Sequence, residues 1–419
     1  MNTTSHTPNP SQPIGLQVSP PAARPGTFFA GAPSVSAASP RARRSAFLRD
    51  AFRPFYLGGS LFAALAIPLW LGMWYHQSFT PSLPALYWHT HEMVFGFAVA
   101  IIIGFLFTAA RNWTGLTLPD GVPLATLVTL WLAGRVGVFF FYGAPAAIVD
   151  SLLLPIVAGV LAFKFIRARS FASFPLVGVL IALSIANIAF HAGMMQWIEL
   201  APLGAIEFGL MMVVLIEMII GGRIVPAFTA SAIPGVRQRR SAWLNRAAII
   251  LAAAAFVSDA SRAPPRLIAS FSIVAGALGV VQALGWNPLA TRSKSILWIL
   301  HAAYAFIPIG LILLGVSWLN FLPRSAAIHA LAVGSMGGLI MGMITRTALG
   351  HSGRPVRAGR AETICYALVL LAALLRGSAS LVPPACMAFM LGAGTAWSAA
   401  FLLYAITYAP ILCRARATT

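Results

Sequence analysis

The chain is divided into apolar stretches, each about as long as a helix that crosses a lipid bilayer. Such a helix needs roughly 20 consecutive, mainly apolar residues, and twelve segments of about this length follow one another after residue 46. They lie at about 55–75, 88–110, 122–142, 145–167, 173–198, 202–222, 243–260, 264–285, 295–318, 325–347, 361–380 and 383–412. The pattern predicts an all-α fold, a polytopic transmembrane bundle of about twelve spanning helices.

The charge of the chain has to be interpreted against this pattern. Charged residues make up 9% of the sequence, against roughly 25% in an ordinary soluble domain. A net charge of +19 would suggest nucleic-acid binding in a soluble protein. Here the basic residues stand in short runs between apolar segments, which is how membrane topology is encoded. We therefore predict a lipid bilayer as partner and no nucleic acid.

The basic residues also predict an orientation. With both termini in the cytoplasm, all but five of the 28 Lys and Arg residues fall on the cytoplasmic side or tail. The five exceptions are Arg135, within the third segment, and Arg262, Arg266, Arg324 and Arg376. Residues 1–46 are rich in Pro, Ser, Ala and Thr, so we predict a disordered cytoplasmic tail. Residues 47–419 then form the twelve-helix transmembrane domain.

Some kinds of site are absent from the sequence. The three cysteines, Cys365, Cys386 and Cys413, form no CxxC or CxxCH motif. This excludes a disulfide framework, a zinc finger and covalent haem attachment. The chain also has no phosphate-binding loop and no GxGxxG fingerprint.

Histidines gather in the half of the bundle predicted to face outward. His89, His91 and Glu92 open the second segment, although ionisable groups in hydrocarbon are costly and rare. Two residues apart on an α-helix corresponds to roughly 200° of rotation, so the two rings cannot hold one ion together while the helix persists. Either the segment is not helical there, or each histidine serves a different site. Glu92 shares the face of His89, where it is expected to orient a ring nitrogen.

The fifth segment carries one polar stripe on an apolar helix. Ser184, Asn187, His191 and Met194/Met195 follow at steps of three or four. Imidazole and thioether together suit haem iron or copper. The alternative is a histidine bonded to neighbouring backbone and methionines that only pack. With His329 at a similar depth, we predict His89, His91, His191, His329 and Met195 as ligands and Asn187 as a supporting residue.

The tenth segment has a face without side chains. Gly334, Gly338 and Gly342 recur every four residues, and Arg346 continues the same face. Close helix packing explains such a face. A flat macrocycle lying in the groove, with Arg346 pairing a haem propionate, is the alternative.

Other ionisable residues lie deeper or nearer the inner face. Glu207 opens the sixth segment and is expected to support a histidine, and Glu217 is placed near the inner end, beside Arg223. His301 lies toward the inner face and His351 in an inner loop. These two histidines form a separate metal site or, alternatively, His351 is a solvated loop residue.

Five separated blocks resemble one known family. They are FRPFYLGGSLFAALAIPLW, YWHTHEMVFGFAVAIIIGFLFTAARNWTG, NIAFHAG, GGRIVPAFT and HALAVGSMGGLIMGMITRTALGHSGRP. Together they resemble the NnrS family of haem- and copper-containing bacterial inner-membrane proteins, from about Phe52 to near the C-terminus. The resemblance implies non-covalent haem, copper, and a role connected with nitric oxide, denitrification or nitrosative stress. His89, His91, His191, His329 and His351 occupy motif histidines by this resemblance, and Arg53, Glu92, Asn112 and Arg223 occupy motif polar positions.

The leading hypothesis is a haem/copper-binding integral membrane protein that responds to nitric oxide or iron-nitrosyl species. The alternative is a twelve-span secondary transporter with a histidine-lined path and no cofactor. A nitric oxide reductase would need an electron entry point, and the chain has no recognisable electron-donor domain. The sequence assigns no catalytic residue and no oligomeric state.

Overall fold

The computed structural model describes residues 46–76 and 81–416, and all of the regular structure in these ranges is helical. Twelve of its helices, counted across short interruptions, are long and apolar enough to cross a membrane. The predicted all-helical class is therefore confirmed. The predicted tail, residues 1–46, lies outside the described residues except for Ala46.

Ten of the spans are built around a single α-helix. These helices are α1 (Phe52–His76), α4 (Val122–Phe140), α5 (Ala144–Arg167), α6 (Phe174–Met194), α7 (Pro202–Ala232), α8 (Ala242–Ala260), α9 (Pro265–Gly285), α10 (Ser295–Trp318), α13 (Arg360–Leu381) and α14 (Cys386–Cys413). Short 3-10 turns stand at Ala46–Leu48, Phe171–Ser173, Pro288–Thr291 and Pro383–Ala385.

The second and tenth spans are interrupted by π-helix. The second is made of α2 (Ala85–His91), η3 (Glu92–Ala98) and α3 (Val99–Thr114), and the tenth of α11 (Arg324–His329), η6 (Ala330–Gly337) and α12 (Gly338–His351). A π-helix is rare and is frequently found at functional sites. In both spans the π-helix begins directly after a histidine.

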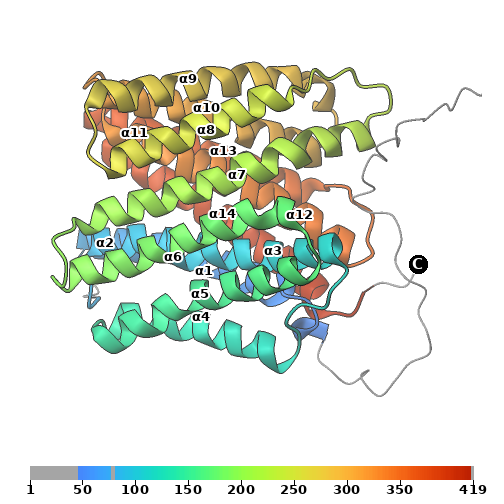
Figure 1. Cartoon of the computed structure of the whole chain (residues 1–419), viewed down its shortest axis with the longest axis horizontal. Helices are drawn as coiled ribbons and strands as arrows, with labels where there is room; N and C mark the ends of the chain where they lie inside the picture. The colour runs from blue at the N-terminus through green and yellow to red at the C-terminus, as the bar shows by residue number, and fades with distance from the viewer. Residues whose placement is uncertain (1–45, 77–80, 417–419) are drawn as a thin grey trace, which may run out of the picture. The chain divides into compact units, whose positions relative to one another are not determined.

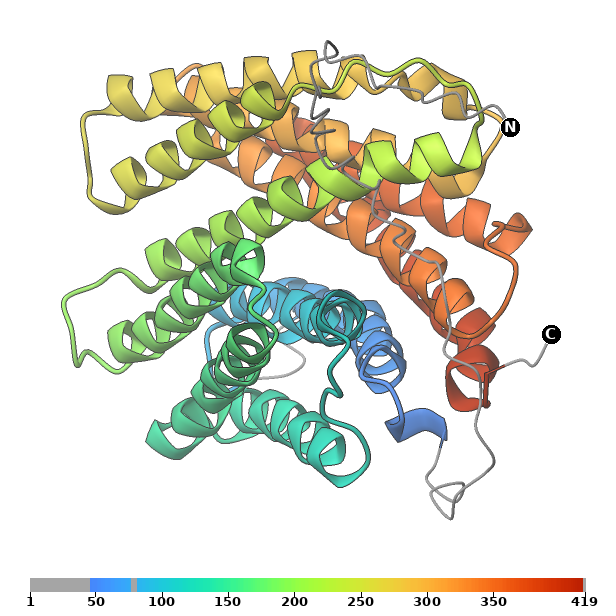
Figure 2. The same cartoon turned by 45° about the vertical axis from the view of Figure 1, so that its right-hand side comes forward.

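Helices that follow one another along the chain pack side by side, as α4 does on α5, α5 on α6, and α9 on α10 (Figure 1). The last span, α14, packs against the first, α1. Figure 2 shows the red C-terminal helix beside the blue first span. Arg53 of α1 donates to the carbonyl oxygens of Leu412 and Arg414 at 2.9 and 2.6 Å. These bonds satisfy carbonyl groups that the end of a helix leaves without partners.

Two helix ends differ from the sequence-based prediction. The helix α6 ends at Met194, so Met195 lies just beyond it. The helix α7 continues to Ala232, ten residues past the predicted end, because Pro226 is accommodated inside it. Glu217 therefore lies at the middle of a 31-residue helix and not near the end of a shorter one. We call the end of the bundle where α1 begins the basic end.

Candidate metal centre and histidine cavity

His91 lies in a buried polar cluster built by four spans. Its Nδ1 lies 3.0 Å from Glu92 Oε1, and its Nε2 lies 2.9 Å from Asn187 Oδ1 and 3.3 Å from Asp150 Oδ2. His91 and Glu92 are both completely buried. Both ring nitrogens of His91 face oxygen atoms. Without a metal ion, both nitrogens can donate a hydrogen bond to these oxygens. With a metal ion, Nε2 would lose its proton and bind the ion.

His191 approaches the same carboxylate from α6. Its Nε2 lies 3.0 Å from Asp150 Oδ2, and its Nδ1 lies 3.2 Å from the hydroxyl of Tyr142. Burial raises the pKa of Tyr142 to about 12, so the phenol keeps its proton at neutral pH and donates it to Nδ1. His191 then carries its own proton on Nε2 and donates it to Asp150. Asn187 adds a further donor to the same carboxylate oxygen at 2.9 Å.

Arg135 balances the two carboxylates. Its Nη1 lies 2.7 Å from Glu92 Oε2, and its Nη2 forms an ion pair with Asp150 Oδ1. All three side chains are at least nine-tenths buried. Charges in an apolar interior are tolerated when they are paired and hydrogen-bonded. Arg135 therefore gives both carboxylates a cationic partner and fixes their positions.

Two glycines make room for this ion pair. A Cβ atom at Gly134 would lie 2.7 Å from Asp150 Oδ1, and one at Gly96 would lie 2.7 Å from Arg135 Nη1 and 2.8 Å from Glu92 Oε2. Gly96 belongs to the π-helix that begins at Glu92. The backbone is thus shaped around the charged groups.

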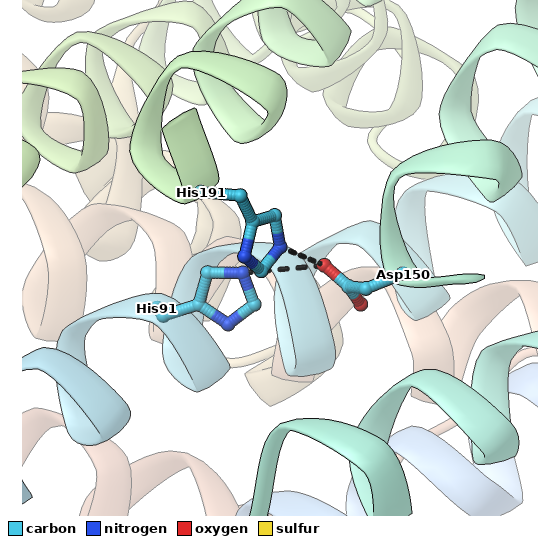
Figure 3. A group of neighbouring side chains, drawn as sticks. All are labelled: His91, Asp150 and His191. Atoms are coloured by element: carbon cyan, nitrogen blue, oxygen red, sulfur yellow. Dashed lines mark hydrogen bonds and ion pairs between the residues drawn. The ribbon is translucent and has the colours of Figure 1, made fainter. Parts of the chain in front are cut away.

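The cluster offers three atoms to one ion. Ligand atoms of His91, Asp150 and His191 all lie within 4.8 Å of one another (Figure 3). The three side chains come from the end of α2, from α5 and from α6. Two imidazoles and one carboxylate suit copper, iron or zinc better than calcium or magnesium. Around them, Glu92, Asn187 and Tyr142 hold the rings and Asp150 in place, as outer partners do in metal sites.

His89 lies on the other side of the second span. Its ring stacks on Trp70 of α1 with centroids 4.1 Å apart. Its Nδ1 is buried and has no hydrogen-bond partner among the described residues. The expected contact between Glu92 and His89 is wrong, because the carboxylate of Glu92 contacts His91 and Arg135 instead.

A cavity of about 150 Å³ joins His89 to His329. His329 Nδ1 lies 2.7 Å from the backbone oxygen of Ser325. That bond requires the proton on Nδ1, which leaves a lone pair on Nε2. The other lining residues are mainly apolar and include Met336 and Met390. Arg376 also lines the cavity.

Arg376 brings a positive charge to this cavity. It donates to Ser380 Oγ at 3.0 Å and reaches Ser325 Oγ at 3.4 Å. No carboxylate forms an ion pair with it within residues 46–76 and 81–416. The cavity therefore combines two imidazoles with a guanidinium that lacks an anionic partner.

The remaining predicted site residues lie elsewhere. Glu207 borders the cavity but pairs with Arg324 at 2.7 Å, so its predicted contact with a histidine is wrong. Met195 is partly exposed beyond α6, and the cluster's hydrogen bonds among described residues do not include its sulfur. Arg346 lies over the ring of Phe228 at 3.9 Å, away from both histidine groups.

The two histidines nearest the basic end do not meet. His301 Nε2 lies 2.8 Å from the hydroxyl of Thr229. His351 is the last residue of α12, and its ring lies 5.7 Å from that of Phe52. The predicted loop position of His351 is wrong, and no shared metal site of these two histidines forms within the described residues.

Sequence reasoning missed Asp150 and Tyr142 and gave no role to Arg135. A signal was present for two of them. Asp150 is the only acidic residue between positions 121 and 198, and Arg135 is the only basic residue between positions 112 and 163. Isolated opposite charges in neighbouring apolar spans are expected to form an ion pair, because each needs a partner in the membrane interior.

The family described as NnrS protein matches residues 46–416, nearly the whole chain. The chain belongs to the NnrS family. No match was found among curated proteins. The NnrS match spans both interrupted helices, the polar cluster and the histidine cavity, so all of them belong to the family region.

Proposed function

We propose that this NnrS-family protein holds a metal ion at His91, Asp150 and His191 and a haem at the cavity between His89 and His329. The observation that carries the proposal is the convergence of two imidazoles and a carboxylate from three separate helices. Copper is the ion we favour, as the family resemblance implies, and ferrous iron fits the same donors.

The cavity offers two imidazole nitrogens to a haem iron. The Nδ1 of His89, which has no hydrogen-bond partner among the described residues, and the lone pair on Nε2 of His329 would hold it. Arg376 supplies a cation for a propionate group. The volume of about 150 Å³ is below the roughly 300 Å³ at which small-molecule pockets begin. The donor set therefore fits haem, and the apolar lining has to rearrange to admit the ring.

Nitric oxide is the ligand that we propose for this protein, because a ferrous haem would supply the chemistry that binds it. The residues of the chain have separate tasks in this scheme. His89 and His329 are the residues that would hold the haem, and the apolar lining would exclude water. On the other side of the second span, Glu92, Asn187 and Tyr142 orient the ligands of the metal ion.

The location proposed here follows from charge. We propose that the chain lies in a bacterial inner membrane with both termini in the cytoplasm, and the basic residues between the spans support this orientation. The cluster and the histidine cavity then lie nearer the periplasmic surface.

The proposal is tested by composition and spectra of purified protein. We expect copper by elemental analysis, a Soret band, and a shift of that band on addition of nitric oxide. His191→Ala should lose the ion and keep the haem, while His329→Ala should lose the haem and keep the ion. A wild-type protein with neither a Soret band nor bound metal would contradict the proposal.

Transport is a second candidate, favoured by the two interrupted spans. Transporters use broken helices to form sites inside the membrane, and π-helix interrupts the second and tenth spans here. Substrate-dependent flux in proteoliposomes that contain no cofactor would support transport over the leading proposal.

A further inference from the structure

The middle of the bundle holds one acidic side chain that neither site uses. Glu217 is the central residue of α7. The other acidic side chains within the described spans mostly pair with a cation, as Glu92 and Asp150 do with Arg135, and Glu207 and Asp259 with Arg324. Glu217 forms no ion pair within the described residues, and its hydrogen bond goes to Ser335.

Hydrogen-bond geometry identifies the protonation state of Glu217. Ser335 Oγ lies 2.9 Å from Glu217 Oε2 and 2.7 Å from the carbonyl oxygen of Leu331. A serine hydroxyl has one proton and cannot donate to both oxygens. The carbonyl oxygen of Leu331 can only accept, and it lies at the shorter distance. With the serine proton on that carbonyl, the contact between Ser335 and Glu217 is a hydrogen bond only when Glu217 donates, as a neutral carboxylic acid does.

Glu217 borders a second cavity, of about 80 Å³. Its lining is apolar except for two side chains, Glu217 and Tyr56. Tyr56 lies one turn from the start of α1 at the basic end. A cavity of this size holds a water molecule only where polar partners exist, and these two side chains provide them.

Tyr56 continues the polar chain toward the basic end. Thr347 Oγ1 lies 2.6 Å from the carbonyl oxygen of Met343 and 3.1 Å from the hydroxyl of Tyr56. The threonine proton goes to the carbonyl, so Tyr56 donates to Thr347. The lone pairs of the Tyr56 oxygen remain free to accept a proton from the cavity side.

The titratable groups around the Glu217 carboxyl group carry no charge at neutral pH. The titratable side chains that face it are phenols, Tyr56 across the cavity and Tyr304 of α10, whose ring packs on Gly221 one turn further along α7. Ser335 belongs to the π-helix η6, and the next residue, Met336, lines the histidine cavity. Glu217 thus stands between the two cavities.

We propose that Glu217 is a proton-exchange site, a neutral carboxylic acid that gains and releases its proton through the cavity shared with Tyr56 at the basic end. One proton enters and one leaves, and no electron moves. The proposal does not depend on the bound metal or haem.

Infrared spectroscopy of the full-length purified protein tests the protonation state. We expect a protonated-carboxyl carbonyl band at neutral pH that is absent in Glu217→Gln. Ser335→Ala should shift this band, because the acid loses its hydrogen-bond acceptor. Glu207→Gln is the matched control on the same helix, and it should keep the band. An identical band in wild type and Glu217→Gln, or no band in wild type, would overturn the proposal.

Deuterium exchange tests the route. The band should shift when the protein is moved into heavy water, and Tyr56→Phe should slow that shift about tenfold, the rate equivalent of about one lost hydrogen bond. A variant with the wild-type exchange rate would overturn the route through Tyr56. Size-exclusion profiles and helicity of each variant establish that it is folded, and metal and haem contents report separately on the function proposed above.

Discussion

The second and tenth spans share one backbone plan and surround it with different chemistry. Each contains the pattern H-x4-G-x7-G-x10-G, with the histidine at His91 or His329. Each has a π-helix directly after that histidine and ends on a glycine with positive φ, Gly115 at 68° and Gly353 at 72°. The second span packs on α1 and the tenth on α10.

The difference between them lies in the neighbours. His91 is followed by Glu92 and meets Asp150 and His191, so it belongs to a closed network with every ring nitrogen paired. His329 is followed by Ala330 and faces an apolar cavity. The comparison teaches that the same sequence of α-helix, histidine and π-helix can serve two environments, and that residues from other spans decide whether the histidine enters a polar cluster or lines a cavity.

The largest effect should come from removing one charge of the polar cluster. Asp150→Ala leaves Arg135 without one of its two partners in an apolar interior, which costs about 3–5 kcal/mol of unfolding free energy. Thermal unfolding in detergent measures the loss. The matched change at the cavity is Arg376→Met, which strands no opposite charge and should destabilise far less. Equal losses of unfolding free energy in the two variants would contradict the prediction that only the polar cluster depends on ion pairs.

Overpacking one glycine of the cluster should have the next largest effect. Gly134→Ala places a methyl group 2.7 Å from Asp150 Oδ1, and forcing such a contact costs about 1–3 kcal/mol. Gly178→Ala on α6 is the control, because a Cβ atom there meets nothing within 4 Å. The same unfolding assay compares the two, and a neutral Gly134→Ala would show that the cluster is looser than its distances indicate.

Asn187→Ala should weaken metal binding in the polar cluster without affecting the histidine cavity. It removes the amide that orients His91 and Asp150 and leaves the three proposed ligands in place. Loss of an outer partner lowers metal affinity about 10- to 100-fold. Competition with a chelator measures this change. Haem content should stay at the wild-type level, since the cavity lies on the other side of the second span.

Tyr142→Phe should have the smallest effect at neutral pH, about 1 kcal/mol for one hydrogen bond to His191. The variant should differ from wild type mainly in how its unfolding free energy depends on pH in the alkaline range. The folded pKa of Tyr142 is raised to about 12 from an ordinary value of about 10. Its contribution is therefore complete below pH about 10 and is lost as pH rises toward 12. Unfolding across this window should show a shallower fall in the variant than in wild type, and parallel curves would contradict the assignment.

The sequence by itself determined the twelve spans and the family, because hydrophobicity and segment length are local properties. It also indicated that His89 and His91 face different directions, since helical rotation depends only on spacing. It did not place Glu92 correctly, because the partners of this carboxylate are His91 and an arginine of another span, Arg135.

Only the tertiary structure decided which residues meet. Asp150 and Arg135 join His91 because α4, α5 and α6 are rotated so that their few polar side chains face one another. The rotation of a helix about its own axis depends on packing with all its neighbours, so a polar residue in one span does not identify its partner. Packing also decided the surroundings of Glu217. The sequence placed it beside Arg223, but in the structure it contacts Ser335 and lines a cavity.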